Sequence, residues 1–307
     1  DDDLLNRNGS NEVTLGTVTS QWGTSSTRWS SLYKSIARAT KVIQALDNGS
    51  ATGISESKVN QYKGEAYFML GFAYCELTAY YGDCVLNKGM TLDEAYVATR
   101  SPKNEVLAYA FECLDKAAEY MPNSSKGQQR PTKGAALGFK ARFALFHEDW
   151  QTAVDAAQKC MDLGVYKLHD NYREMFQATS SPEFMFYFKG DLTLKKGYGF
   201  MENVRDFVIR KIGGHCNQSP SLELFCSYTC TDGLPIDKST LYNPKDPFAN
   251  RDPRLAMTIQ PFKTKYSADY AEYEQSKKDG TFPEKYPDYI TLGYEFNLSP
   301  YANTVYE

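Results

Sequence analysis

Apolar residues recur every three or four positions through the first half of the chain, which is the pattern of amphipathic helices. The spacing predicts five helices, at residues 29–46, 55–81, 103–120, 132–147 and 150–163. Stop signals follow four of them, at Asn48-Gly49, Gly82-Asp83, Pro122 and Gly164. Residues 1–27 are polar and rich in Asn, Ser, Thr and Gly, so we expect a loop there.

The inward stripes identify the residues that we expect to be buried. In the first helix they include Ile36, Ala39, Val42 and Ile43. The stripe of the second helix comprises Ala66, Met69, Leu70, Ala73, Leu77 and Tyr80. Trp29 and Trp150 lie on helical faces, and we assign both to the core.

The last two predicted helices are separated only by Glu148-Asp149, so they must form an antiparallel hairpin. Small residues recur on their facing sides and allow close backbone approach: Ala135, Ala136, Gly138, Ala141, Ala144, Ala153, Ala156 and Ala157. This is the physics of a tetratricopeptide (TPR) hairpin. Several such pairs in succession indicate a short helical solenoid.

After about residue 170 the helical period fades, and Gly, Pro, Asp and aromatic residues dominate. Runs at 183–189 and 207–212 fit brief strands or turns. We therefore predict a mostly α fold in a single domain, residues 1–307. A TPR-like helical-hairpin scaffold (an α-α superhelix) spans 29–165, and an irregular, loop-rich region with a few short strands spans 166–307. Irregular regions carried on rigid scaffolds commonly hold binding sites.

Charge and hydropathy exclude several classes of protein. The net charge of −4 leaves no basic footprint for nucleic acid. No run of 18 apolar residues is present, which excludes a transmembrane helix. The chain begins Asp1-Asp2-Asp3 without a signal-peptide pattern, so it is either processed or trimmed, or cytosolic. Aromatic residues make up 14% of the chain, which suggests recognition surfaces besides core.

The seven cysteines are an odd number. Cys75, Cys113 and Cys160 fall on apolar helical faces and are expected to be small core residues. Cys216, Cys226 and Cys230 cluster in a loop-rich stretch where one disulfide is an option. Zinc is less favoured, because there is no CxxC pair and the three histidines are scattered.

Five elements of the sequence resemble, in order, those of the SusD/RagB family. They are W-x-x-L-Y-x-x-I at 29–36, the helix 65–74 followed by Y-G-D at 81–83, the R-P-T-K-G-A-A segment 130–136 with 140–142 and 149–150, D-G-L-P-I at 232–236, and N-R-D-P-R-L at 250–255. Gly71 departs mildly from the family pattern. Together the elements span about three-quarters of the chain.

The resemblance implies a lipid-anchored protein at the outer-membrane cell surface. Such a protein captures oligosaccharides for a SusC-like TonB-dependent transporter, without catalysis and without a cofactor. Family members are usually longer and carry a lipidated N-terminal cysteine, which is absent here. We therefore expect a trimmed chain, a fragment or an unusually short member.

Sugars stack their C–H faces on exposed aromatic rings, while their hydroxyls bond to amides, carboxylates and guanidinium groups. Trp22 in the polar N-terminal loop, with Arg28 nearby, is the first candidate. Tyr198 and Phe200 between glycines come next, since glycine permits close approach of a ligand. Further candidates are Asn203, Asp206, Tyr266, Tyr270 and Tyr273. A packed, purely structural role is the competing interpretation for each.

The charged segment 250–254 favours a structural role. Two arginines around one aspartate at a proline-fixed turn are expected to tie the irregular region to the helices. No G-x-S-x-G, HExxH, P-loop or dinucleotide motif is present, so we do not expect an enzyme. Glycan capture thus leads. A TPR-like module that binds a protein or peptide is the alternative, and a glycan hydrolase comes third.

Overall fold

The computed structural model describes residues 3–6, 12–13, 15–124, 130–176, 178–187, 206, 215–261, 275, 278–279 and 294–295. The chain divides into two compact units. A helical unit comprises Thr19–His169 and Ser180–Phe188. A second unit comprises Asp1–Val18, Asp170–Thr179 and Lys189–Glu307. The single domain over residues 1–307 stays a prediction.

The helical unit contains every helix that the hydrophobic period predicted. The helices are α1 (Gly23–Asp47), α2 (Glu56–Tyr81), α3 (Leu92–Val97), α4 (Lys103–Tyr120), α5 (Lys133–Phe146) and α6 (Trp150–Met161). The mostly α fold of packed helix pairs is confirmed. Helix α1 begins at Gly23 rather than at residue 29, so residues 23–27 are helical and not loop.

Helix α3 was missed, although its N-terminus carries a clear signal. Thr91 and Glu94 form a capping box, in which Thr91 Oγ1 accepts from Glu94 N–H and the Glu94 carboxylate accepts from Thr91 N–H. These hydrogen bonds lower the pKa of Glu94. The six-residue helix has no buried side chain, so no hydrophobic period marked it.

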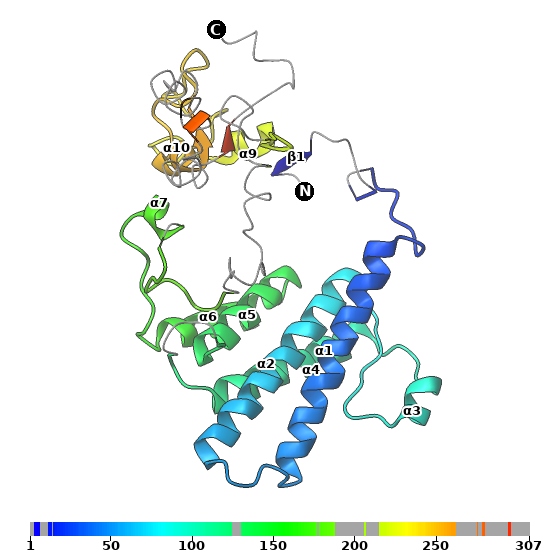
Figure 1. Cartoon of the computed structure of the whole chain (residues 1–307). Helices are drawn as coiled ribbons and strands as arrows, with labels where there is room; N and C mark the ends of the chain where they lie inside the picture. The colour runs from blue at the N-terminus through cyan, green and yellow to red at the C-terminus, as the bar shows by residue number, and fades with distance from the viewer. Residues whose placement is uncertain are drawn as a thin grey trace. The chain divides into compact units, whose positions relative to one another are not determined.

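The helices pack in sequence, α1 on α2, α2 on α4, α4 on α5 and α5 on α6 (Figure 1). Helix α2 lies between α1 and α4 and supplies the largest buried side chains, among them Phe68, Leu70, Tyr74 and Leu77. Buried Ile36 on α1 and Leu114 on α4 belong to the same core cluster. One continuous apolar core therefore unites the unit.

Two glycines let α2 and α4 approach closely. A Cβ atom on Gly71 would lie 2.6 Å from Leu114 Cγ and 2.9 Å from the Ala110 carbonyl oxygen. A Cβ on Gly64, two turns earlier, would lie 2.5 Å from Met121 Cγ. The departure from the family pattern at Gly71 thus has a packing reason.

Helices α5 and α6 form the predicted antiparallel hairpin. Glu148 takes a left-handed conformation, φ 62°, and reverses the chain. Asp149 Oδ1 then accepts from Thr152 N–H and caps α6, and the Thr152 hydrogen bonds lower the pKa of Asp149. Ala136, Ala144 and Ala156 are buried. Close packing of small residues in this hairpin is confirmed.

Three residues that we expected to be buried are exposed. Tyr80 is 61% exposed because Tyr81 takes the next inward position of α2 after Leu77. Trp150 is 60% exposed, because α6 packs on α5 alone within the described part of the helical unit. Val42 also faces outward from α1. Trp29, in contrast, packs against the core as predicted.

The second unit holds short elements. Strand β1 (Leu4–Asn6) pairs antiparallel with β2 (Gln218–Pro220), with Leu4 opposite Pro220. Strand β3 (Ile259–Gln260) pairs parallel with β4 (Tyr294–Glu295). Among its described residues, the helices are α7 (Tyr172–Met175), α9 (Leu222–Ser227) and α10 (Pro253–Thr258). Phe225, Leu255 and Ile259 form its small core.

These elements correct one expectation, and for another they leave the alternative without a strand. Residues 4–6, which we expected to be loop, form a strand. The sequence did not predict it because the pairing strand lies over 200 residues away and leaves no local signal. Residues 183–187 form no strand. The rest of that run and the whole run 207–212 lie outside the described residues.

We expect Gly71→Ala to lower the free energy of unfolding by about 1–3 kcal/mol, since the added methyl group overpacks the α2–α4 contact. Urea denaturation followed by circular dichroism measures this change. Gly23→Ala is the control, because no other group lies within 4 Å of the place that a Cβ atom on Gly23 would take. Equal stability of both variants would contradict the close contact.

His147 at the end of α5 links stability to pH. Thr78 Oγ1 donates to the Cys75 carbonyl, so it accepts from His147 Nε2, 3.3 Å away. Nδ1 is buried and has no partner in the described structure. Burial, with a smaller contribution from Lys103, lowers the pKa of His147 below its ordinary value of 6.5. The folded chain therefore holds the neutral ring.

We expect stability to fall as the pH drops from about 7.5 to about 5.5, since the unfolded chain takes up a proton there and the folded chain resists it. His147→Gln should flatten this slope in urea titrations at a series of pH values. The other two histidines are common to both proteins and cancel in the comparison. Parallel slopes for the two proteins would contradict a buried neutral His147.

Candidate functional site

The start of α1 and the end of α2 meet at one end of the helical unit. Tyr81 at the end of α2 donates its hydroxyl proton to the Ser25 carbonyl in the first turn of α1, at 2.6 Å. Asp83 just beyond α2 accepts from the Lys103 N–H at the start of α4, at 2.8 Å. These two bonds connect the end of α2 to the starts of α1 and α4 at one end of the bundle.

A half-buried aromatic cluster lies at this end. The Trp29 ring is 4.9 Å from Tyr33 and 5.0 Å, edge to face, from Tyr81. The Arg100 guanidinium lies 5.4 Å from the Trp29 ring centroid. Tyr33 donates to the Val85 carbonyl at 2.8 Å, and burial raises its pKa, so it remains a neutral donor.

An exposed polar group lies beside these rings, and we call Arg28, Glu76 and Tyr80 the Arg28 cluster. Arg28 on α1 forms an ion pair with Glu76 on α2. Its guanidinium carbon lies 3.9 Å from the centroid of the Tyr80 ring. Desolvation lowers the pKa of Arg28, but the hydrogen bond and charge of Glu76 outweigh that effect and raise it.

The Arg28 cluster combines three chemistries in one place. Tyr80 presents an exposed ring, Glu76 a carboxylate acceptor and Arg28 several N–H donors. Sequence reasoning selected Arg28 but missed Glu76 and Tyr80. Their spacing of four residues places them on one side of a helix, but nothing in the sequence indicates that this side faces Arg28.

Of the predicted glycan residues, the structure describes Trp22, Arg28 and Asp206. Trp22 is half-buried and directly precedes α1, where its carbonyl accepts from Ser25 N–H at 3.0 Å. Tyr198, Phe200, Asn203, Tyr266, Tyr270 and Tyr273 lie outside the described residues. Asp206 accepts from the Asn217 amide at 2.7 Å and contacts His215. The glycan role of all these residues stays a prediction.

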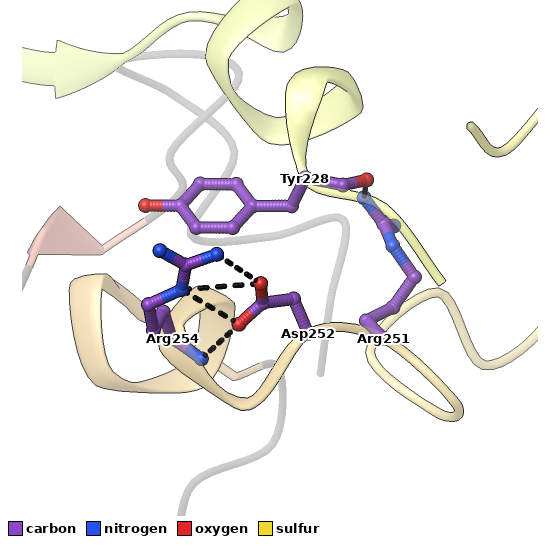
Figure 2. Close-up of polar contacts among 4 residues, drawn as sticks. All are labelled: Tyr228, Arg251, Asp252 and Arg254. Atoms are coloured by element: carbon purple, nitrogen blue, oxygen red, sulfur yellow. Dashed lines mark hydrogen bonds and ion pairs between the residues drawn. The ribbon is translucent and has the colours of Figure 1, made fainter. Parts of the chain in front are cut away.

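The segment 250–254 has the structural role that we expected, with different partners. Arg251 is 5% exposed and donates to the carbonyls of Phe225, Tyr228 and Pro247, at 2.7, 2.9 and 3.0 Å. Arg254 pairs instead with Asp252, and Figure 2 shows the Tyr228 ring directed toward this second arginine.

Asp252 also caps α10 by accepting from Arg254 N–H at 2.9 Å, and Pro253 follows at the first helical position. The Arg254 hydrogen bond is the main cause of the lowered pKa of Asp252. Among the described contacts, Arg251 and Arg254 join segments of the second unit to one another. The expectation that they tie the irregular region to the scaffold helices stays a prediction.

The cysteines and acidic residues form no further chemical centre in the described part of the chain. No disulfide joins Cys216, Cys226 and Cys230, and Cys216 Sγ lies 3.8 Å from Ser219 Oγ. Cys75 and Cys113 are core thiols whose pKa values are raised by burial. No group of three potential metal ligands was found among the described residues. No described helix is long and apolar enough to cross a membrane.

Comparison with known proteins finds one family model that matches the first half of the chain. Residues 4–145, which include α1 to α4 and most of α5, match the SusD-like family, described as starch-binding and associating with the outer membrane. Over these residues the chain is similar to the SusD-like family. The resemblance carried by the five sequence elements agrees with this match.

A SusD-like protein of Formosa agariphila, named P2, is 26% identical over 198 residues, which are 61% of this chain and 38% of that protein. A crystal structure of a SusD-like carbohydrate-binding protein from Bacteroides fragilis superposes with a TM-score of 0.70 and 24% identity. The superposition covers 88% of this chain and 56% of the Bacteroides fragilis chain.

A SusD superfamily structure from Bacteroides vulgatus gives a TM-score of 0.62 with 21% identity over 78% of this chain and 53% of its own. These likenesses confirm the SusD-like, TPR-like helical fold. The chain spans 38% of the length of the Formosa relative and about half of each solved chain.

We expect Arg251→Met to lower the free energy of unfolding by about 3 kcal/mol, because three buried carbonyls lose a charged donor. Hydrogen exchange at residues 222–258 should accelerate in parallel. Arg254→Met is the matched control and should change stability far less, since Arg254 is mostly exposed. An Arg251 variant as stable as its control would show that the carbonyl contacts contribute little.

Proposed function

We propose that this chain belongs to a non-catalytic glycan-binding protein of the outer-membrane surface. The match of residues 4–145 to a family described as starch-binding carries the proposal. The description of the Bacteroides fragilis protein as carbohydrate-binding supports the same ligand class. Delivery to a SusC-like TonB-dependent transporter, and a lipid anchor on the complete protein, are parts of the same proposal.

The Arg28 cluster is the part of the described surface whose chemistry best suits a sugar. The exposed ring of Tyr80 offers a stacking surface for the C–H face of a pyranose. Arg28 and Glu76 stand within reach of the same ligand and offer charged donors and acceptors for its hydroxyls. Because the two charges neutralise each other, the cluster favours a neutral ligand over an ionic one.

Trp22 and Arg28 thus keep their proposed role as ligand residues, and Glu76 and Tyr80 join them. Tyr198, Phe200, Asn203, Tyr266 and Tyr270 remain proposed on sequence grounds alone.

A protein or peptide partner is the second candidate, and one observation favours it. Helix α6 exposes Trp150, Val154 and Met161 on its outer side. An exposed apolar face of this kind is typical of protein-interaction sites.

We expect Tyr80→Ala to weaken oligosaccharide binding by about fivefold, through loss of the stacking ring. Isothermal titration with maltoheptaose, xylohexaose and cellohexaose provides the measurement. Trp22→Ala tests the second aromatic candidate in the same series. Tyr96→Ala is the control, since Tyr96 is exposed on α3 and has no contact with the Arg28 cluster in the described structure.

Two results would overturn parts of the proposal. An unchanged affinity in Tyr80→Ala would remove the Arg28 cluster from the site. No heat with any glycan, together with a peptide that binds wild-type chain and not Trp150→Ala, would favour the protein partner. Reducing ends released from the glycans by the pure chain would indicate a hydrolase.

A further inference from the structure

A cavity lies at the opposite end of α2 from the Arg28 cluster. Its volume is about 450 Å³, and it is lined by Glu56, Ser57, Asn60, Gln61, Tyr120, Met121 and Pro122. The two ends of α2 are separated by about 20 residues, or roughly 30 Å at 1.5 Å per residue. The cavity is therefore independent of the site proposed above.

The α2–α4 contact shapes this cavity. Glu56 and Asn60, and likewise Ser57 and Gln61, are four residues apart and so project from one side of α2. The opposite wall is the end of α4 and its exit, from Tyr120 to Pro122. One turn further along α2, Gly64 packs against Met121, which is itself one of the lining residues.

The amide of Gln61 is held in one orientation. Its Oε1 accepts from Lys58 Nζ at 3.1 Å, and its Nε2 donates to Glu65 Oε1 at 3.1 Å. Glu65 in turn accepts from Arg130 Nε at 2.7 Å. The amide keeps one further lone pair and one further N–H for a ligand.

The neighbouring Asn60 amide has all of its hydrogen-bond donors and acceptors available for a ligand. Asn60 is half-buried, and its side chain makes no hydrogen bond to any residue that the structure describes. An amide offers two donors and two acceptor lone pairs. Two adjacent amides with mixed donors and acceptors match vicinal hydroxyl groups, which also donate and accept.

The other wall supplies an apolar surface. The Tyr120 ring stacks on Tyr67 with centroids 6.2 Å apart and an interplanar angle of 10°, which fixes its position. Met121 and Pro122 extend this surface. A polar wall of amides that faces an apolar wall suits a ring with one hydroxylated edge and one C–H face.

We infer that this cavity binds a single sugar ring of a neutral glycan, as a second site on the same chain. The lone charged side chain of the lining is the Glu56 carboxylate, which disfavours anionic ligands. The inference takes its ligand class from the proposed function, but its residues and its place in the fold are independent of the Arg28 cluster.

Saturation-transfer NMR of the whole chain with D-glucose, D-xylose and D-galactose tests the inference. We expect signal transfer to at least one sugar, with affinity about fivefold lower in Asn60→Ala. Ser57→Lys should block the cavity by volume at an exposed position. Asn104→Ala, an exposed amide on α4 outside the cavity, is the matched control and should bind as wild type.

The outcomes separate the two sites. Transfer lost in Asn60→Ala and Ser57→Lys but kept in Tyr80→Ala supports the cavity. Transfer lost only in Tyr80→Ala overturns the cavity and leaves the proposed function standing. Transfer to none of these monosaccharides overturns the cavity, while maltoheptaose titration still decides the proposed function separately.

Discussion

The close contact between α2 and α4 is the interaction on which the helical unit depends. Gly64 and Gly71 have no side chains, so the two backbones come close together. Leu114 of α4 and Met121 just beyond its end fill the space that a side chain at either glycine position would occupy. Helices α1 and α5 pack on the two sides of this pair. Met121, which packs against Gly64 in this contact, also lines the cavity at the start of α2, so packing and candidate chemistry share one part of the structure.

Most of the scaffold could be predicted because helical information is local. Periodic apolar positions and the stop signals predicted α2 and α4 to within a residue, and Glu148-Asp149 predicted the α5–α6 hairpin. The exposure of individual side chains was harder to predict than the helices themselves. Tyr80 and Trp150 satisfy a helical period, but whether a face is covered depends on which helices pack on it, and that information is not local.

The candidate site was predictable only in part. Arg28 was selected for its chemistry, yet its partners Glu76 and Tyr80 lie about fifty residues further along the chain. Similarly, Arg251 precedes Asp252 in the sequence, yet it donates to carbonyls that folding of the second unit brings together. The sequence thus identified the important arginines, while the tertiary structure determined which groups they bind.

The central proposal is that this helical chain binds neutral glycans through side chains at the two ends of α2. Amide chemical-shift mapping of the isotope-labelled chain with maltoheptaose tests this most directly. The claim predicts shifts clustered at residues 25–29 and 76–83, and at 56–61 and 120–122. Shifts confined to the outer face of α6, or no shifts at saturating glycan, would contradict it.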